Sequence, residues 1–412
     1  MNKYYSQSRW KYKKRYLGSI LKTVIKEIPI VVLTGSRQVG KSTLLQNELP
    51  AGRWKYLTLD DFDVLERAKE DPVGLISGYD KLIIDEVQKE RGLIESIKLN
   101  VDKGKGKYIL SGSANILLMD KISETLAGRA AYLVLDPMIR GEIAEEPKPK
   151  WFMNLFEGRL PDKKSCSAVD PLQFMLKGFM PRVIYLKKLE NILKWWEGYV
   201  ATYMERDLRN ISNISSLTEF RKVMEALALR TGNLINQSEI ARDSGVSQSS
   251  AYRYINLMEV GHIIKKVTPF FPNRTKRIVK SPKVYWVDPA LAVFLSGYYN
   301  AGSLKNAREL GGFFENLVFL HLNVLCELMV PKGKIYYYRE VNQKEVDFVI
   351  EYGKEKIAVE VKLTVSPHYK DTKGLRYFME EYPDTKSAVL IHAGREVKKF
   401  GDKIVAVPWS IL

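Results

Sequence analysis

VVLTGSRQVGKST, residues 31–43, joins an apolar run to a turn that is rich in glycine. The run from Ile30 to Leu33 predicts a buried strand, and the residues behind the turn predict the start of a helix. The turn fits the pattern Gly-x-x-x-x-Gly-Lys-Ser/Thr, in which the glycines let backbone N–H groups face an anion. We therefore predict a phosphate-binding turn made of Gly35, Ser36, Arg37, Gln38, Val39, Gly40, Lys41, Ser42 and Thr43.

Two side chains of this turn have expected roles. Lys41 is expected to reach the β- and γ-phosphates of a nucleotide, and Ser42 to place its hydroxyl on Mg²⁺. The stretch Lys-Leu-Ile-Ile-Asp-Glu at 81–86 predicts a second strand that ends in two acids, about 45 residues after Gly40. At that spacing Asp85 is expected to hold Mg²⁺, mostly through water, and Glu86 to polarise the attacking water.

Further strands are predicted at 56–59, 107–110 and 132–135. The strand at 107–110 ends in Ser111-Gly-Ser113, and either serine is placed to sense the γ-phosphate. Gly128 predicts the end of a helix and Arg129 a rigid corner, where the arginine acts on the phosphate in cis, acts on a neighbouring molecule, or is an ordinary surface residue. Five apolar strands separated by helical stretches predict an open, mostly parallel α/β sheet.

Composition limits the class of protein. The chain has 412 residues, which predicts two to three domains, and a formal net charge of +17, which favours a nucleic-acid partner. Two cysteines make neither a disulfide framework nor a metal cluster, and they fit a reducing cytoplasm. No apolar run has the length of a membrane span and no signal peptide is visible, so we expect a cytoplasmic protein. The basic, aromatic N-terminal segment could contact phosphates and stack bases. We interpret it instead as a solvated lead-in whose aromatic residues pack on the first domain.

Residues 217–290 have the pattern of a helix-turn-helix followed by a wing. A proline-rich break at 145–150 and a helix at 188–210 precede it. Three helices are predicted around the turn Gly245-Val-Ser247, followed by a strand from Gly261 and a basic hairpin within Phe270–Val287. A winged helix-turn-helix binds double-stranded DNA or docks a protein partner, and both functions are open here. For DNA, the contacts are expected from Gln248, Ser249, Ser250 and Arg253 on the third helix and from Arg274, Lys276 and Arg277 on the wing.

The C-terminal segment carries carboxylates at strand spacing. Runs at 345–350 and 357–362 predict two paired strands, which bring Asp347 close to Glu360 and Lys362. Glu315, on a preceding helix, is a candidate fourth member. Carboxylates of this kind hold Mg²⁺ and a neighbouring lysine orients water, although charged strand faces without a metal are the alternative.

Two resemblances follow from these motifs. The segments GSRQVGKST, LIIDEVQ, ILSGSAN and LAGR resemble the AAA-type ATPase domain of a large bacterial and archaeal family with a second domain of unknown function. Asp347 with Glu360-Val-Lys362 resembles the PD-(D/E)xK nuclease core, without its proline. The first resemblance implies ATP rather than GTP. With the proline-rich break and the helix-turn-helix pattern, they predict an ATPase domain at 1–160, a helical connector at 161–215, a winged helix at 216–300 and a nuclease-like α/β domain at 301–412.

Three functions are open on this evidence. In the first, Mg²⁺-dependent ATP hydrolysis is coupled to a DNA-binding, nuclease-like C-terminal half in DNA processing or defence. In the second, ATP controls a switch whose winged helix docks a protein while the nuclease-like core is inactive. In the third, the protein is primarily a metal-dependent nuclease gated by ATP. Arg129 acting on a neighbour would require an oligomer.

Overall fold

The computed structural model describes residues 11–50, 52–112, 125–162, 165–202, 216–271, 281–340 and 344–412. The chain forms two compact units. The first consists of Met1–Met138 with Val260–His262, and the second of Ile139–Glu259 with Ile263–Leu412. Within the described ranges, no helix has both the length and the apolar character needed to cross a membrane.

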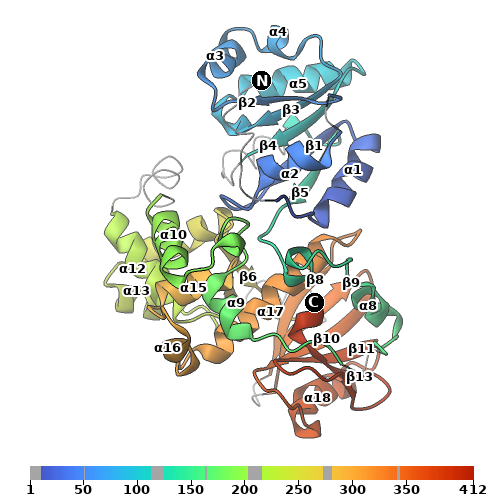
Figure 1. Ribbon diagram of the computed structural model, residues 1–412, viewed down its shortest axis with the longest axis vertical. Coiled ribbons are helices and arrows are strands. Elements are labelled where there is room, and N and C mark those ends of the chain that lie inside the picture. Colours follow the sequence, from blue (N-terminus) through green and yellow to red (C-terminus); the bar gives the residue numbers. More distant parts are fainter. Residues whose placement is uncertain are drawn as a thin grey trace. The chain divides into compact units, whose positions relative to one another are not determined.

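A five-stranded sheet forms the centre of the first unit (Figure 1). Its strands lie in the order β2-β3-β4-β1-β5, and all four neighbouring pairs are parallel. The bounds are β1 Ile30–Thr34, β2 Lys55–Thr58, β3 Lys81–Asp85, β4 Lys107–Ser111 and β5 Ala130–Val134. The predicted parallel α/β sheet is confirmed. Because β4 lies between β1 and β3, its carboxyl end lies between the phosphate-binding turn and Asp85.

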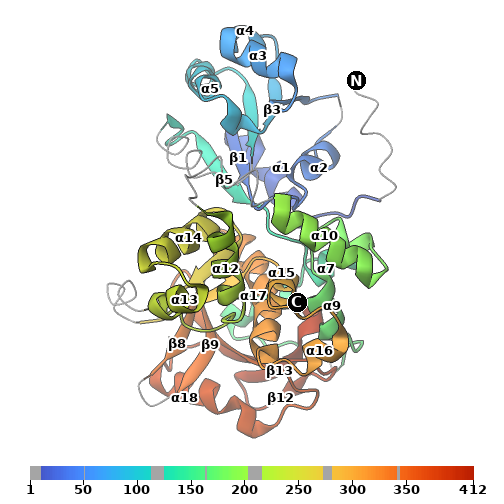
Figure 2. The same cartoon turned by 90° about the vertical axis from the view of Figure 1, so that its left-hand side faces the viewer.

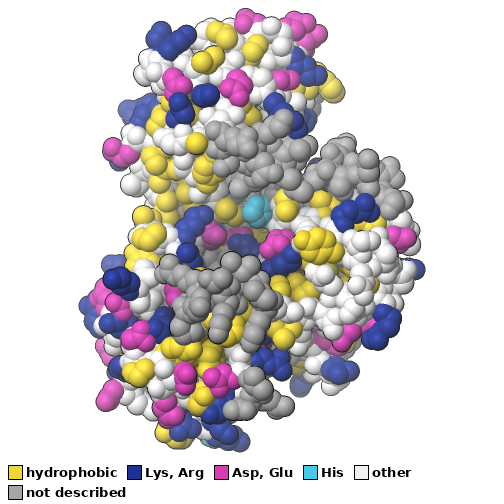
Figure 3. All heavy atoms as spheres, turned by 180° about the vertical axis from the view of Figure 1, so that it is seen from behind, with side chains coloured by type: hydrophobic (Ala, Val, Ile, Leu, Met, Phe, Trp, Pro, Cys, Tyr) yellow, Lys and Arg dark blue, Asp and Glu magenta, His cyan; other side chains and the backbone are white. Residues whose placement is uncertain are grey.

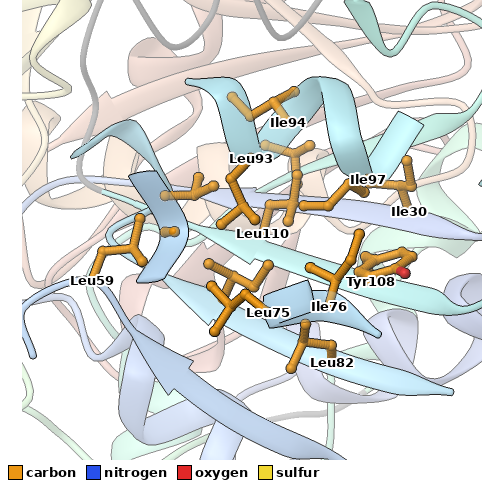
Figure 4. Packing of buried hydrophobic residues seen from close by; sticks show 14 of the residues in the cluster. Ile30, Leu59, Leu75, Ile76, Leu82, Leu93, Ile94, Ile97, Tyr108 and Leu110 are labelled. Carbon is orange, nitrogen blue, oxygen red and sulfur yellow. The ribbon is translucent and has the colours of Figure 1, made fainter. Parts of the chain in front are cut away.

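Helices cover both faces of this sheet. Alternate residues of β1 point to opposite faces, so Ile30 and Val32 join one core while Val31 and Leu33 are buried on the other face. The first core packs the sheet against α3 Phe62–Glu70, α4 Pro72–Ile76 and α5 Gly92–Asp102 (Figure 4). Two further helices among the described residues, α1 Leu17–Glu27 and α2 Lys41–Glu48, contact each other, and α1 contacts β1.

The second unit begins with helices and a small sheet. Its first helices are α7 Arg140–Ile143, α8 Lys150–Asn154, α9 Pro171–Lys177 and α10 Leu189–Thr202. A bundle of α12 Leu217–Ala228, α13 Gln237–Ser244 and α14 Gln248–Val260 follows (Figure 2). Two antiparallel strands, β6 Ile264–Val267 and β7 Lys283–Trp286, come after the bundle, and Leu234 forms an isolated bridge to Lys283.

The predicted hairpin within Phe270–Val287 needs a correction. The antiparallel ladder joins β6 to β7, pairing Ile264 with Trp286 and Val267 with Lys283. The strand that we expected to stand before the hairpin is therefore one of its two arms. Buried apolar residues on both strands explain this pairing, because Ile264, Val267, Val284 and Trp286 are all removed from water.

A six-stranded sheet forms the last part of the second unit, in the order β12-β13-β11-β10-β9-β8. Strands β8 to β10 are antiparallel, β10 is parallel to β11, and β11 is parallel to β13. The helix α17 precedes β8, and α18 connects β10 to β11 and packs on the sheet. The bounds are α15 Pro289–Leu295, α16 Ala301–Lys305, α17 Leu310–Glu327, β8 Lys334–Arg339, β9 Glu345–Tyr352, β10 Glu355–Lys362, α18 Lys373–Glu381, β11 Ser387–His392, β12 Lys398–Lys399 and β13 Ile404–Pro408.

Candidate functional site

The glycine-rich turn between β1 and α2 has the backbone of an anion-binding loop. Gly35 and Gly40 have φ values of 146° and 92°, which side chains disfavour. A Cβ on Gly35 would lie 2.2 Å from the carbonyl oxygen of Leu135, so the position has no room for a side chain. Lys41 Nζ donates to the carbonyl oxygens of Gly35 and Ser36, each at 3.0 Å. The lysine is therefore folded over the turn that it is expected to serve.

Ser36 shows that this turn fits a further ligand. Its hydroxyl oxygen is buried and has no hydrogen-bond partner in the structure. A buried polar atom without a partner is costly, and an incoming acceptor such as a phosphate oxygen would relieve that cost. The turn, its free hydroxyl and the N-terminus of α2 thus form a donor set that suits phosphate.

Asp85 is the centre of the site, at the carboxyl end of β3. Its Oδ2 accepts from Ser42 Oγ and from the Tyr56 hydroxyl, both at 2.5 Å. Its Oδ1 accepts from Ser111 Oγ at 2.5 Å and from the Glu86 backbone N–H at 3.1 Å. The parallel order β3-β4-β1 brings these groups to one edge of the sheet. Three predicted residues, Ser42, Asp85 and Ser111, therefore lie together.

Glu86 follows directly in a left-handed backbone conformation, with φ of 55°. Gln88 Nε2 donates to its carboxylate. Burial raises the pKa of Glu86 above its ordinary value, the charge of Asp85 raises it further, and Lys41 opposes the shift. A carboxylate with a raised pKa is a better proton acceptor at neutral pH, as activation of a water molecule requires.

Two residues at the site were missed in the sequence. Tyr56 on β2 donates to Asp85, and Arg15 Nη1 and Nη2 donate to the carbonyl oxygens of Val39 and Asp136 at 3.0 and 2.6 Å. Arg15 is 6% exposed, so it is a buried brace behind the turn rather than part of a solvated basic segment. Neither contact has a local signal, because each joins residues at least 24 positions apart.

Arg129 lies at the amino-terminal ends of the strands, opposite the ends that carry Asp85 and the phosphate-binding turn. It directly precedes β5, whose parallel partner β1 leads into the phosphate-binding turn at its far end. Its guanidinium pairs with Asp102 at the end of α5, with Nη2 at 3.0 Å from Oδ2. The arrangement gives this arginine no access in cis to a nucleotide on the turn, since the length of the strand separates them. The alternative of action on a neighbouring molecule stays a prediction.

A second group of carboxylates lies in the C-terminal sheet of the second unit. Asp347 on β9 and Glu360 on β10 are near each other, and Glu315 on α17 faces them. Asp347 Oδ2 accepts from the Val361 backbone N–H at 2.7 Å, and Lys362 Nζ lies 2.7 Å from Glu360 Oε1. The four residues that the sequence grouped are thus neighbours in the structure.

A further residue, Lys283 on β7, lies in the middle of this group. Its Nζ is 3.1 Å from Glu315 Oε1, 2.7 Å from Glu345 Oε1 and 3.9 Å from Asp347 Oδ1. Tyr285 also donates to Glu315. Across the described residues, no three His, Cys, Asp or Glu side chains are arranged to hold a metal ion. Glu315 and Asp347 do not fit the Mg²⁺ that the nuclease resemblance implies, because an ammonium group already contacts both of them.

The predicted DNA-contacting residues divide into two sets. Gln248, Ser249 and Arg253 are exposed on the first turns of α14, and Ser250 is half-buried. Ser247 caps this helix, with its Oγ 3.1 Å from the Ser250 backbone N–H. On the face shown in Figure 3, basic side chains of the described residues are mixed with acidic ones and form no broad area of one charge. The remaining predicted residues Ser113, Arg274, Lys276 and Arg277 lie outside the described residues.

Three sequence families match successive parts of the chain. A family described as "AAA domain" matches residues 27–144. Two families described as "Domain of unknown function", DUF8612 and DUF4143, match residues 170–301 and 310–412. With the turn and Asp85, the first match identifies a P-loop ATPase domain, followed by a C-terminal region whose family descriptions name no function.

The chain is also similar to two curated proteins. An uncharacterized protein of Mycobacterium tuberculosis is 28% identical over 399 residues, covering 96% of this chain and 83% of that protein. An uncharacterized protein of Haemophilus influenzae is 21% identical over 381 residues, covering 86% of this chain and 87% of the other. These similarities span both units, so the combination of the two is not peculiar to this chain.

Solved structures give weaker likenesses. The Walker-type ATPase of Pyrococcus abyssi matches with a TM-score of 0.46 and 17% identity, covering 69% of this chain and 96% of that one. The ORC1 protein of Aeropyrum pernix in complex with DNA matches with a TM-score of 0.29 and 12% identity, covering 68% and 90%. At these scores neither likeness supports a statement about activity.

Proposed function

We propose that the first unit hydrolyses ATP with Mg²⁺. The observation that carries the proposal is the junction at Asp85, where Ser42 from the phosphate-binding turn and Ser111 from β4 both donate to one buried carboxylate. Ser42 and Asp85 are the residues that would hold Mg²⁺, and Lys41 would hold the phosphates. An ion held there would supply positive charge against the negative charge that develops on the phosphates.

In this proposal Glu86 accepts a proton from the attacking water and Ser111 senses the γ-phosphate. Glu86 is suited to its role because its carboxylate is confined beside Asp85 and held by Gln88. We choose ATP over GTP because of the AAA match, and no contact to the nucleotide base enters this choice.

The test is the rate of phosphate release and nucleotide affinity in matched variants. Lys41→Ala is expected to lose ATP binding, and Glu86→Gln to bind ATP while turnover falls at least 100-fold. Lys69→Ala and Glu66→Gln, which change exposed residues of α3, are the controls. Turnover that survives Glu86→Gln would remove Glu86 from the mechanism.

For the second unit we propose the domain boundaries and folds predicted from the sequence. The order of three helices and an antiparallel pair β6-β7, with the bridge at Leu234, supports a winged helix-turn-helix at 216–300. The order α17-β8-β9-β10-α18-β11, with β10 parallel to β11, supports a nuclease-like core at 301–412. The proposed limits of the preceding parts of the chain are 1–160 for the ATPase domain and 161–215 for the helical connector.

A second candidate function is binding of double-stranded DNA by α14. Its exposed first turns, with Gln248, Ser249 and Arg253, favour it, because a recognition helix reads base edges from its N-terminal residues. Docking of a protein partner on the same helix is the alternative. ATP hydrolysis is therefore measured with and without double- and single-stranded DNA at low and moderate salt. Stimulation by duplex DNA supports DNA binding, and hydrolysis indifferent to any DNA favours the protein partner.

A further inference from the structure

Lys283 is an almost fully buried lysine that no local pattern explains. It begins β7, its side chain is 4% exposed, and its Nζ lies among Glu315 of α17 and Glu345 and Asp347 of β9. The ring of Tyr337 on β8 is 5.8 Å away on another side. One ammonium group thus joins β8, β9 and α17 to the β6-β7 pair.

These contacts satisfy the lysine and the acids together. A buried ammonium is stable only with partners, and Lys283 has three carboxylates within 3.9 Å. Burial alone lowers the pKa of Lys283, but Glu315, Asp347 and Glu345 together raise it above its ordinary value. The ammonium form is therefore the form present at neutral pH.

The same contacts leave no position for a divalent ion between Glu315 and Asp347. Mg²⁺ binds oxygen at about 2.0–2.1 Å in a near-octahedral shell, so it would have to share Glu315 and Asp347 with Nζ. Two cations bound to the same pair of carboxylates would lie within a few ångströms and repel each other strongly in a buried site. Asp347 Oδ2 is also engaged by the Val361 N–H at 2.7 Å.

We propose that the Lys283 ammonium takes the place of a metal ion in the C-terminal carboxylate cluster, so that this nuclease-like core binds no divalent cation and cuts no nucleic acid. The cluster is a lysine-centred clamp that fixes β7 to α17 and β9. This proposal goes beyond the ATPase proposed for the first unit, and its test needs no ATP.

The remaining carboxylate of the cluster, Glu360, pairs with a different lysine. Its Oε1 lies 2.7 Å from Lys362 Nζ, and its Oε2 is buried without a hydrogen-bond partner.

The test is Mn²⁺ binding to the full chain without nucleotide, measured by the electron paramagnetic resonance signal of free Mn²⁺. Asp85→Asn is included throughout to remove the carboxylate of the first unit. With Lys283 present, no Mn²⁺ is expected to bind at millimolar concentration. Lys283→Met is expected to create a Mn²⁺ site, which the further change Asp347→Asn abolishes. A Mn²⁺ site in the chain that retains Lys283, lost on Asp347→Asn, would overturn the proposal.

Thermal unfolding supplies an independent readout. Lys283→Met leaves Glu315, Glu345 and Asp347 without their cation and is expected to lower the melting temperature by about 10 °C, with recovery when Mn²⁺ is added. Lys265→Met, which removes a lysine of β6 that pairs with Glu327 of α17 outside the cluster, is the control and is expected to show no recovery with Mn²⁺. If Lys283→Met does not fold, the titration of the chain with Lys283, with and without Asp347→Asn, still decides the matter. No loss of stability in Lys283→Met would contradict the clamp.

Discussion

Asp85 accepts a hydrogen bond from Tyr56 in addition to those from Ser42 and Ser111. The Tyr56 hydroxyl and Ser42 Oγ meet the same oxygen, Oδ2, each at 2.5 Å. Burial, and then the neighbouring carboxylate, raise the pKa of the Tyr56 hydroxyl well above its ordinary value, so it remains a donor throughout the neutral range. We infer that Tyr56 orients Asp85 toward Ser42.

Tyr56→Phe should weaken the use of Mg²⁺ without abolishing hydrolysis. Loss of a hydrogen bond to a charged group costs about 1.5 kcal/mol, which corresponds to roughly a tenfold rise in the Mg²⁺ concentration for half-maximal rate. The measurement is the hydrolysis rate at saturating ATP across a Mg²⁺ titration. Tyr108→Phe removes a tyrosine hydroxyl that bonds Asn100 in the same unit and serves as the control. An unchanged Mg²⁺ requirement in Tyr56→Phe would exclude the orienting role.

Among the structural elements, the phosphate-binding turn depends on a residue from the segment before α1. Arg15 reaches the carbonyl oxygens of Val39, in the turn, and Asp136, beyond β5. Arg15→Met keeps the length of the side chain but leaves two buried carbonyl groups without this donor. We expect a loss of about 2–3 kcal/mol in stability and weaker ATP binding. Thermal unfolding and ATP titration check both effects, with Lys14→Met at an exposed position as the control.

In the second unit, α17 is anchored to α7 through His321. Its Nε2 accepts from the Arg140 backbone N–H at 3.1 Å and its Nδ1 donates to the Leu317 carbonyl oxygen at 2.8 Å, so the neutral ring is the bound form. Burial lowers the pKa of His321 to about 4 from the ordinary 6.5. The unfolded chain therefore binds more protons than the folded chain between these values, and stability falls as the pH falls from 6.5 to 4.

His321→Phe should remove this dependence. The stability difference between the unmodified chain and His321→Phe is expected to shrink by about 3 kcal/mol between pH 7 and pH 4, because only the unmodified chain carries the titrating ring. Urea unfolding at a series of pH values measures it. His368→Gln, at an exposed histidine, should leave the difference constant. A constant difference for His321→Phe as well would show that the buried ring does not control this pH range.

At the scale of the whole molecule, the sequence predicted elements better than it predicted contacts. The strands of the first sheet follow from short apolar runs, and the meeting of Ser42, Asp85 and Ser111 follows from parallel order, since the carboxyl ends of neighbouring strands share an edge. The brace from Arg15 and the donor Tyr56 could not be predicted, because charge and aromatic character alone do not name a partner 24 or more positions away.

The second unit shows the same limit. Alternation placed Asp347 and Glu360 on paired strands, which β9 and β10 confirm. Lys283 was not singled out, because it belongs to a basic stretch of sequence and its partners are 32, 62 and 64 residues further along the chain. From sequence alone, a lysine in such a stretch is expected to be exposed and to contact phosphate. The structure shows instead that the Lys283 side chain is buried.

The net charge of +17 leads to the last prediction, which concerns the chain as a whole. If α14 binds duplex DNA, phosphate contacts release counterions and the affinity should fall steeply with salt. Arg253→Ala, on the exposed face of α14, is expected to lower the affinity about 10-fold and to flatten the salt dependence by roughly one contact. Arg395→Ala removes an equal charge at an exposed position near the C-terminal sheet, so it separates a local contact from general attraction. Fluorescence anisotropy of a labelled duplex at several salt concentrations measures both variants. Equal losses in Arg253→Ala and Arg395→Ala would mean that charge attracts DNA without α14, and the helix would then be the surface to test against protein partners.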